Sequence, residues 1–162
     1  MSTVDFQGVP MTPAEAKLVA QALRYTVGAF GDTLDKGGKP AILHSLRVGL
    51  AGTTAQEMAV GFLHDVVEDC GGDLLWLDGH DAAGGVAVFQ AVMALTRLPG
   101  GVHVRREAYA DFIRRIRDAG TCDAVVLIVK RRDLVDNLAR SHEIPDAAER
   151  ERLRARWRAA LE

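Results

Sequence analysis

The sequence predicts an all-α protein. Apolar residues recur at helical spacing along most of its 162 residues, and the alternating pattern of a half-buried strand appears nowhere convincingly. Two segments also begin with capping signatures, which are typical of helix N-termini. With 48% hydrophobic and 26% charged residues, the chain has the composition of a globular protein long enough to bury one core. We therefore expect a single compact, multi-helix domain over residues 1–162.

The first half of the chain predicts three helices. Thr12 and Glu15 have the spacing of a capping box, so a first helix is expected over residues 13–30. The polar, glycine-containing segment 32–40 is expected to be a loop, and residues 42–51 a short apolar helix. The third helix follows a second capping signature, at Thr54 and Glu57. It carries apolar residues on more than one face, and we expect it to run unbroken to the paired glycines that end it.

The second half predicts four more helices, over residues 81–95, 105–117, 124–138 and 147–161. Residues 124–129 have the composition of a buried strand. Their apolar pattern continues at a period of 3.6 to Leu138 with no turn residue between, which favours a helix. Residues 86–88 are the other segment in which a strand is possible.

The charge of the chain excludes some partners. A net charge of −2 argues against long nucleic acids, because that affinity comes mostly from neutralising phosphates. The basic residues are nevertheless concentrated, since Arg97 to Arg132 holds nine Lys or Arg and four Asp or Glu. No apolar run approaches the ~20 residues that cross a bilayer, and no secretory signal is visible. We expect a cytoplasmic protein without a membrane partner; the sequence does not indicate its oligomeric state.

Four acidic or imidazole side chains lie in apolar segments, namely His44, His64, Asp65 and Asp133. Burying carboxylates without partners is costly, and a divalent cation would satisfy all four groups together. Mixed nitrogen and oxygen ligands suit Mn, Fe or Zn. Taken singly, each has an ordinary alternative: a lone histidine on an apolar face is more often a hydrogen-bonded core residue, and a helical aspartate is usually solvated.

Further polar residues surround these four. Glu68 and Asp69 follow the His-Asp pair by four residues each, which in one continuous helix would place them a turn further along the same faces. There they would orient and deprotonate an attacking water. The alternative is that they are simply polar residues at the end of a helix. Negative charge at a helix C-terminus is unfavourable to the helix dipole, and a placement that costs stability favours the functional interpretation. Lys130 lies on an inward-facing helix and is expected to offset phosphate charge.

The order of these motifs resembles the HD-domain metal-dependent phosphohydrolases, and most of all the hydrolase domain of the RelA/SpoT family with its small stand-alone versions. Three segments carry the resemblance: residues 40–48, residues 63–69 with the sequence Leu-His-Asp-Val-Val-Glu-Asp, and residues 129–138. The resemblance spans about residues 36–138. It implies an HD-domain helix bundle that removes pyrophosphate from the 3′ position of guanosine tetra- or pentaphosphate, a small phosphorylated nucleotide.

The resemblance also implies roles for particular residues. One metal ion, usually Mn²⁺ in this family, would be bound by His44, His64, Asp65 and Asp133. The attacking water would be positioned by Glu68 and Asp69, and the nucleotide would be contacted by Lys36 and Asn137.

Two positions depart from the family pattern. Asp35 stands where the family commonly has arginine, and Ala41 where it commonly has an aromatic residue. Both belong to the part that grips the nucleotide. Two alternatives therefore stay open: an HD phosphohydrolase of another nucleotide phosphate, and a catalytically idle nucleotide-binding or interaction module whose helix over residues 147–161 docks onto a partner.

Overall fold

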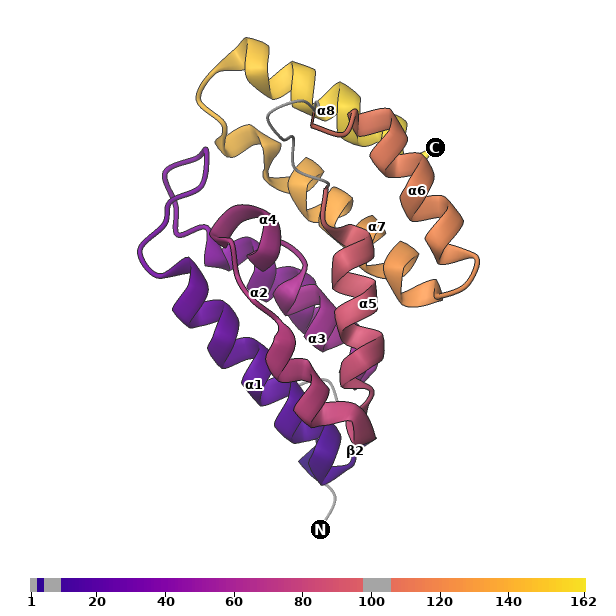
Figure 1. Cartoon of the computed structure of the whole chain (residues 1–162). Helices are drawn as coiled ribbons and strands as arrows, with labels where there is room; N and C mark the ends of the chain where they lie inside the picture. Colours follow the sequence, from indigo (N-terminus) through magenta and orange to yellow (C-terminus); the bar gives the residue numbers. More distant parts are fainter. Residues whose placement is uncertain (1–2, 5–9, 98–105) are drawn as a thin grey trace.

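The protein is a bundle of helices, as predicted, in a computed structural model that describes residues 3–4, 10–97 and 106–162 (Figure 1). The α-helices are α1 (Pro13–Phe30), α2 (Ile42–Leu50), α3 (Ala55–Leu63), α4 (Val66–Cys70), α5 (Gly85–Leu95), α6 (Tyr109–Gly120), α7 (Ala124–Arg140) and α8 (Ala147–Leu161). Two 3-10 segments are η1 (Leu75–Ala83) and η2 (Ser141–Glu143). The short strands β1 (Thr3–Val4) and β2 (Pro10–Met11) pair antiparallel.

Helix α3 is the centre of the fold. Eight of its nine residues are buried, because α1, α2, α5 and α7 all pack against it. In Figure 1, α1 runs along one edge of the bundle, while α6, α7 and α8 gather at the opposite end. Helix α7 contacts α2, α3, α5, α6 and α8, so it joins the two parts. Residues far apart in the sequence are thereby brought against the ends of α3.

Two glycines set the approach of α2 to α3. A Cβ atom on Gly61 of α3 would lie 2.7 Å from Gly49 Cα and 2.9 Å from the Val48 carbonyl oxygen. A Cβ on Gly49 would meet the ring of Phe62 at 2.2 Å. These positions have room for hydrogen only, and this close crossing sets the spacing of the C-terminal end of α2 from the C-terminal end of α3.

Gly61→Ala is expected to lower the free energy of unfolding by roughly 1–3 kcal/mol, as overpacking of a core does. The added methyl group meets backbone, which cannot move aside as a flexible side chain can. Urea denaturation checks this. Gly28→Ala in α1 is the matched control, because a Cβ there meets nothing within 4 Å. Equal stability of the Gly61 variant and the control would contradict this account of the crossing.

The prediction of one unbroken central helix is wrong, because α3 ends at Leu63 and α4 begins at Val66. In a continuous helix the carbonyls of Gly61 and Phe62 accept from residues 65 and 66. Here His64 Nδ1 donates to the Gly61 carbonyl at 2.8 Å. The hydroxyl of Thr26, in α1, lies 3.0 Å from the Phe62 carbonyl oxygen. At the break, side-chain groups thus lie against both of these carbonyl oxygens.

Other boundaries also differ from prediction. Residues 81–95 are not one helix, since Gly84 lies between η1 and α5 with φ of 82°, a left-handed conformation that glycine adopts freely. The possible strand over residues 86–88 lies within α5. Helix α6 begins at Tyr109, later than predicted, and Arg105 is outside the described residues. The helices expected over residues 13–30, 124–138 and 147–161 are confirmed.

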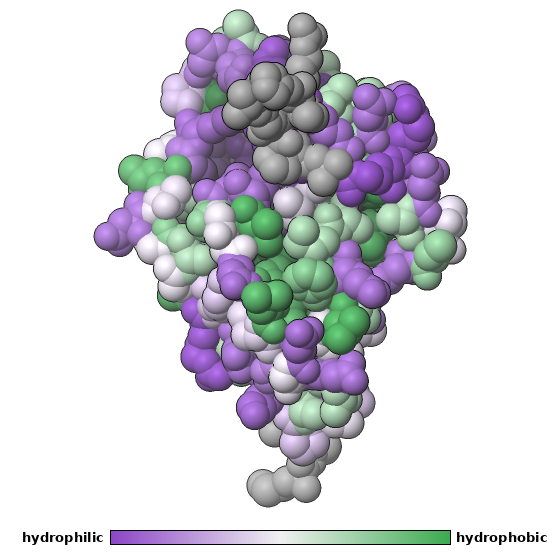
Figure 2. All heavy atoms as spheres, in the orientation of Figure 1, coloured by the Kyte–Doolittle hydropathy of each residue, from purple (hydrophilic) through white to green (hydrophobic). Residues whose placement is uncertain are grey.

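Figure 2 shows apolar side chains gathered near the middle of the face seen in Figure 1, with hydrophilic residues around them. Exposed apolar residues on α5 and η1 include Val86, Met93 and Leu75. Within the described residues, no helix combines the length and the apolar character that crossing a membrane requires.

Candidate metal centre

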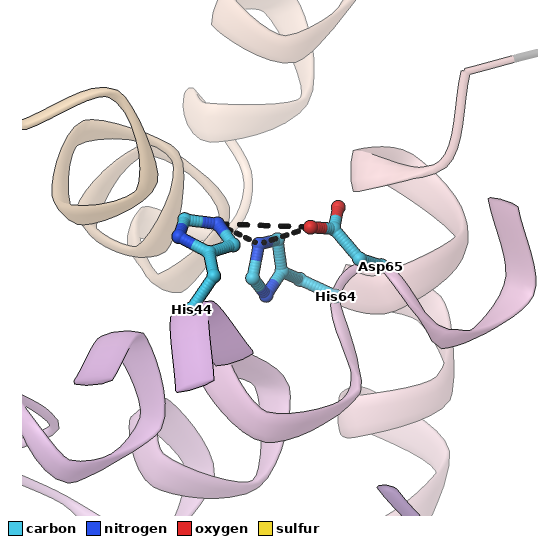
Figure 3. A group of neighbouring side chains, drawn as sticks. All are labelled: His44, His64 and Asp65. Atoms are coloured by element: carbon cyan, nitrogen blue, oxygen red, sulfur yellow. Dashed lines mark hydrogen bonds and ion pairs between the residues drawn. The ribbon is translucent and has the colours of Figure 1, made fainter. Parts of the chain in front are cut away.

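Three parts of the chain bring the four predicted metal ligands together. His44 lies in the first turn of α2, His64 and Asp65 lie in the break between α3 and α4, and Asp133 lies in α7. Figure 3 shows the side chains of His44, His64 and Asp65 directed toward one another. His64 and Asp65 are consecutive residues, and residues of a regular helix diverge by about 100° around its axis, so a shared ion lies between the two directions.

The donor atoms of the cluster are close enough to share one ion. His44 Nε2 lies 3.2 Å from His64 Nε2, 3.6 Å from Asp65 Oδ2 and 3.1 Å from Asp133 Oδ1. His64 Nε2 is 3.1 Å from Asp65 Oδ2 and 4.0 Å from Asp133 Oδ1. A ligand atom from each of His44, His64 and Asp65 lies within 4.8 Å of the other two.

These distances fit a divalent cation. Ligands on adjacent positions around an ion with bonds of about 2.1 Å lie roughly 3 Å apart. Two imidazole nitrogens and two carboxylate oxygens also form the mixed set that suits Mn, Fe or Zn. His64 Nδ1 donates to the Gly61 carbonyl, which leaves the Nε2 lone pair of the neutral ring facing the other donors. The residues present therefore fit a metal.

Asp136 fixes the orientation of His44, and sequence analysis missed it. His44 Nδ1 donates to Asp136 Oδ2 at 2.8 Å, while Arg47 holds both carboxylate oxygens at 2.6 and 2.9 Å. Burial opposes the charge on Asp136, but the hydrogen bonds from His44 and Arg47 outweigh it and lower the pKa of Asp136 to about 2. The signal available was its position three residues after Asp133, on the same face of α7.

Asp136→Asn is expected to weaken Mn²⁺ binding about 10- to 100-fold, the usual effect of removing the partner that orients a ligating histidine. Titration calorimetry with Mn²⁺ measures it. Arg140→Gln serves as the control, since Arg140 lies on the same helix and contacts Glu143 instead. Unchanged affinity in the Asp136 variant would show that the His44 ring needs no such support.

Asp133 has further partners on its own helix. Lys130 Nζ donates to Asp133 Oδ2 at 2.6 Å, and Asn137 Nδ2 donates to Asp133 Oδ1. Burial opposes ionisation of Asp133, but the charge of Lys130 and the hydrogen bond from His44 hold its pKa well below the usual range. Lys130 and Asn137, both predicted to bind substrate, thus contact a predicted metal ligand directly.

Metal binding is expected to release protons. Burial opposes the charge on His44, but hydrogen bonds to Asp133 and Asp136 outweigh it and raise the pKa of His44 from 6.5 to about 10. At pH 7 the metal-free ring is therefore protonated, and a metal must displace that proton, so Mn²⁺ affinity should rise with pH up to about 10. The same shift stabilises the metal-free fold fully below pH 6.5, and the contribution is lost as pH rises through about 10.

Calorimetry in buffers of different ionisation enthalpy counts the released protons. At pH 7 we expect about one proton per Mn²⁺ from His44, and His44→Ala should remove that contribution. An affinity for Mn²⁺ that does not change between pH 6.5 and 8 would contradict the assignment.

Glu68 and Asp69 occupy different surroundings. Asp69 lies one turn after Asp65 in α4, with its N–H donating to the Asp65 carbonyl at 2.8 Å. Burial, and then the charges of Asp65 and Glu68, raise the pKa of Asp69 from 3.8 to about 6. Glu68 turns toward the basic segment, where it accepts from the Arg97 N–H at 3.1 Å and pairs with Arg106. Because the helix is broken, Glu68 does not continue the face of His64.

Two cavities reach the cluster. The first, of about 460 Å³, is lined by residues that include Ala41, His44 and Asp136. Lys36, the other predicted substrate contact, lies there with its side chain 63% exposed and paired to Glu149 at 3.3 Å. The second, of about 180 Å³, is lined by residues of α6, α7 and α8. Asp65, Asp69, Asn137 and Trp157 border both cavities.

Asp35 has a local structural role. Its Oδ1 accepts from the N–H of Gly37 at 2.8 Å and of Lys39 at 2.9 Å, which shapes the loop beside the first cavity. A side chain engaged in this way is not available to stack on a base.

A comparison with protein-family models finds none that matches this chain.

Proposed function

We propose that this protein is a metal-dependent phosphohydrolase of a small phosphorylated nucleotide, of the HD-domain type. One observation carries the proposal: His44, His64 and Asp65 bring ligand atoms within 4.8 Å of one another, with Asp133 beside both imidazoles, at the boundary of two cavities. A purely structural cluster needs no such access. The arrangement combines a cation site with open space for a substrate beside it.

A divalent cation held by His44, His64, Asp65 and Asp133 would polarise a phosphoryl oxygen and make water more acidic. The protein's own residues supply the rest. Asp69, whose pKa is raised to about 6, is suited to accept a proton near neutral pH. Glu68 accepts from the backbone N–H of Arg97 and pairs with Arg106, and these contacts hold α4 against the segment that contains the two arginines. Lys130 donates to Asp133 Oδ2 and keeps this carboxylate charged.

A hydrolysis screen with added Mn²⁺ tests the proposal. Its substrates are guanosine tetra- and pentaphosphate, nucleoside mono-, di- and triphosphates, and their 3′-phosphates. Turnover of at least one nucleotide that is lost with a chelator and restored by Mn²⁺ supports the proposal. Binding of metal and nucleotide with no turnover would support the idle-module alternative.

The choice of nucleotide is the second question. Release of pyrophosphate from guanosine 3′-pyrophosphates is the activity that the family resemblance implies. A different nucleotide phosphate is favoured by Asp35, which is engaged in its own loop, and by Ala41, which leaves the first cavity without an aromatic surface at that position. The relative kcat/KM values across the screen separate these two possibilities.

A further inference from the structure

Two arginine side chains at the second cavity have no carboxylate within ion-pair distance among the described residues. Arg97, which follows α5, and Arg156, in α8, both line it. The Arg97 Nε donates to the backbone carbonyl of Glu107 at 2.8 Å, and neither arginine has an ion pair within the described parts of the chain. Burial, together with the positive charges of Arg152 and Arg97, lowers the pKa of Arg156. Two like charges at one cavity are unfavourable unless an anion joins them.

Two polar atoms at this cavity also lack partners. The Tyr109 hydroxyl and the Arg156 Nε are buried and make no hydrogen bond within the described residues. The Arg156 guanidinium lies over the Tyr109 ring, with Cζ 4.4 Å from the ring centroid, so the contact orders both groups. Buried polar atoms normally have hydrogen-bond partners. Here two unpaired donors belong to residues that line the second cavity.

Three of the carboxylates at the same cavity have ion-pair partners: Asp133 is paired with Lys130 and His44, Asp65 with His64, and Glu68 with Arg106. Asp69 also lines the cavity and has no ion pair within the described residues. The two arginines supply the positive charge at this cavity that is likewise without an ion pair. Because Asp65, Asp69 and Asn137 border this cavity, a ligand in it lies next to the cluster of candidate metal ligands.

We propose that Arg97, Tyr109 and Arg156 form an anion subsite for a phosphate or pyrophosphate group beside the metal cluster. Guanidinium groups bind such oxyanions with strong, directional hydrogen bonds. The role of this subsite in turnover rests on the proposed function: the organic part of the substrate would occupy the first cavity, and the phosphate released by hydrolysis would be held by these arginines. Anion binding itself requires no turnover, so it is tested separately.

The test is calorimetric titration of the full chain with inorganic phosphate and with pyrophosphate, with and without one equivalent of Mn²⁺. Arg156→Gln is expected to weaken binding of the preferred anion about 10- to 100-fold, the effect of losing a hydrogen bond to a charged group. Arg158→Gln, an exposed arginine two residues later on α8, is the matched control and should change it less than about twofold.

Tyr109→Phe removes only the hydroxyl and should weaken binding about 10-fold while the fold, checked by thermal unfolding, is kept. It preserves a readout if the Arg156 variant does not fold. Comparison of the two anions tells which of them the subsite holds. Absence of binding by the unchanged chain, or equal binding by the Arg156 and Arg158 variants, would overturn the proposal. Hydrolysis without Arg156-dependent anion binding rejects the subsite alone, and Arg156-dependent binding without any hydrolysis rejects the proposed function alone.

Discussion

Asp65→Ala is expected to abolish both Mn²⁺ binding and nucleotide hydrolysis. The substitution removes one of only two carboxylates among the candidate ligands and leaves the two imidazoles of His44 and His64 facing each other. The side chain of Asp65 is 31% exposed, so its loss creates no buried cavity and the fold should survive. We expect kcat/KM to fall at least about 1000-fold, a loss of about 4 kcal/mol of transition-state stabilisation.

Asp78→Ala is the control for this experiment. Asp78 is an exposed carboxylate of η1, away from both cavities. Circular dichroism should show the same helix content in both variants, and calorimetry should show Mn²⁺ binding only in the control. Hydrolysis by the Asp65 variant at the rate of the unchanged protein would refute the assignment of the metal centre.

Asp133→Ala is expected to cost roughly 3–5 kcal/mol of stability, because it leaves a buried ammonium without its counter-charge. The side chains of Lys130 and Asp133 are only 15% and 6% exposed. Urea denaturation measures the change. The double variant Lys130→Met with Asp133→Ala removes both charges, and we expect it to be more stable than Asp133→Ala alone.

The pH dependence of this loss has a defined sign. The folded pKa of Asp133 lies below its ordinary value of 3.8. Its contribution is therefore present above about pH 3.8 and disappears as pH falls, so the unchanged protein and the variant should converge in stability in acid. A double variant no more stable than the single one would show that burial of the Lys130 ammonium is not the source of the cost.

The regular parts of the fold followed from local patterns. Thr12 and Glu15 make the capping box expected of them, and the segment that begins at Ala124 is helical although its composition alone favours a strand. The four metal-ligand candidates were identified from charged residues in apolar segments, and they converge in space. Each of these inferences depends on residues close together in the sequence, which is where periodicity and capping carry information.

The features that were missed depend on contacts between distant elements. The break at His64 lies against a hydroxyl from α1, and the support of His44 by Asp136 requires α2 and α7 to meet. Arg97 and Arg156 line one cavity although they lie far apart in the sequence. Local patterns do not encode such contacts; for Asp136 they indicate only that it shares a face of α7 with Asp133.

The Thr26 hydroxyl gives α1 an influence on the cluster, although α1 contributes no ligand to it. Thr26 is fully buried and lies against the Phe62 carbonyl oxygen, at the joint between α3 and α4. Two of the candidate ligands, His64 and Asp65, project from this joint. The alignment of the ligands is thus coupled to how α1 packs. Substitutions in α1 that move Thr26 would change the direction of the ligands, although they lie far from the candidate metal.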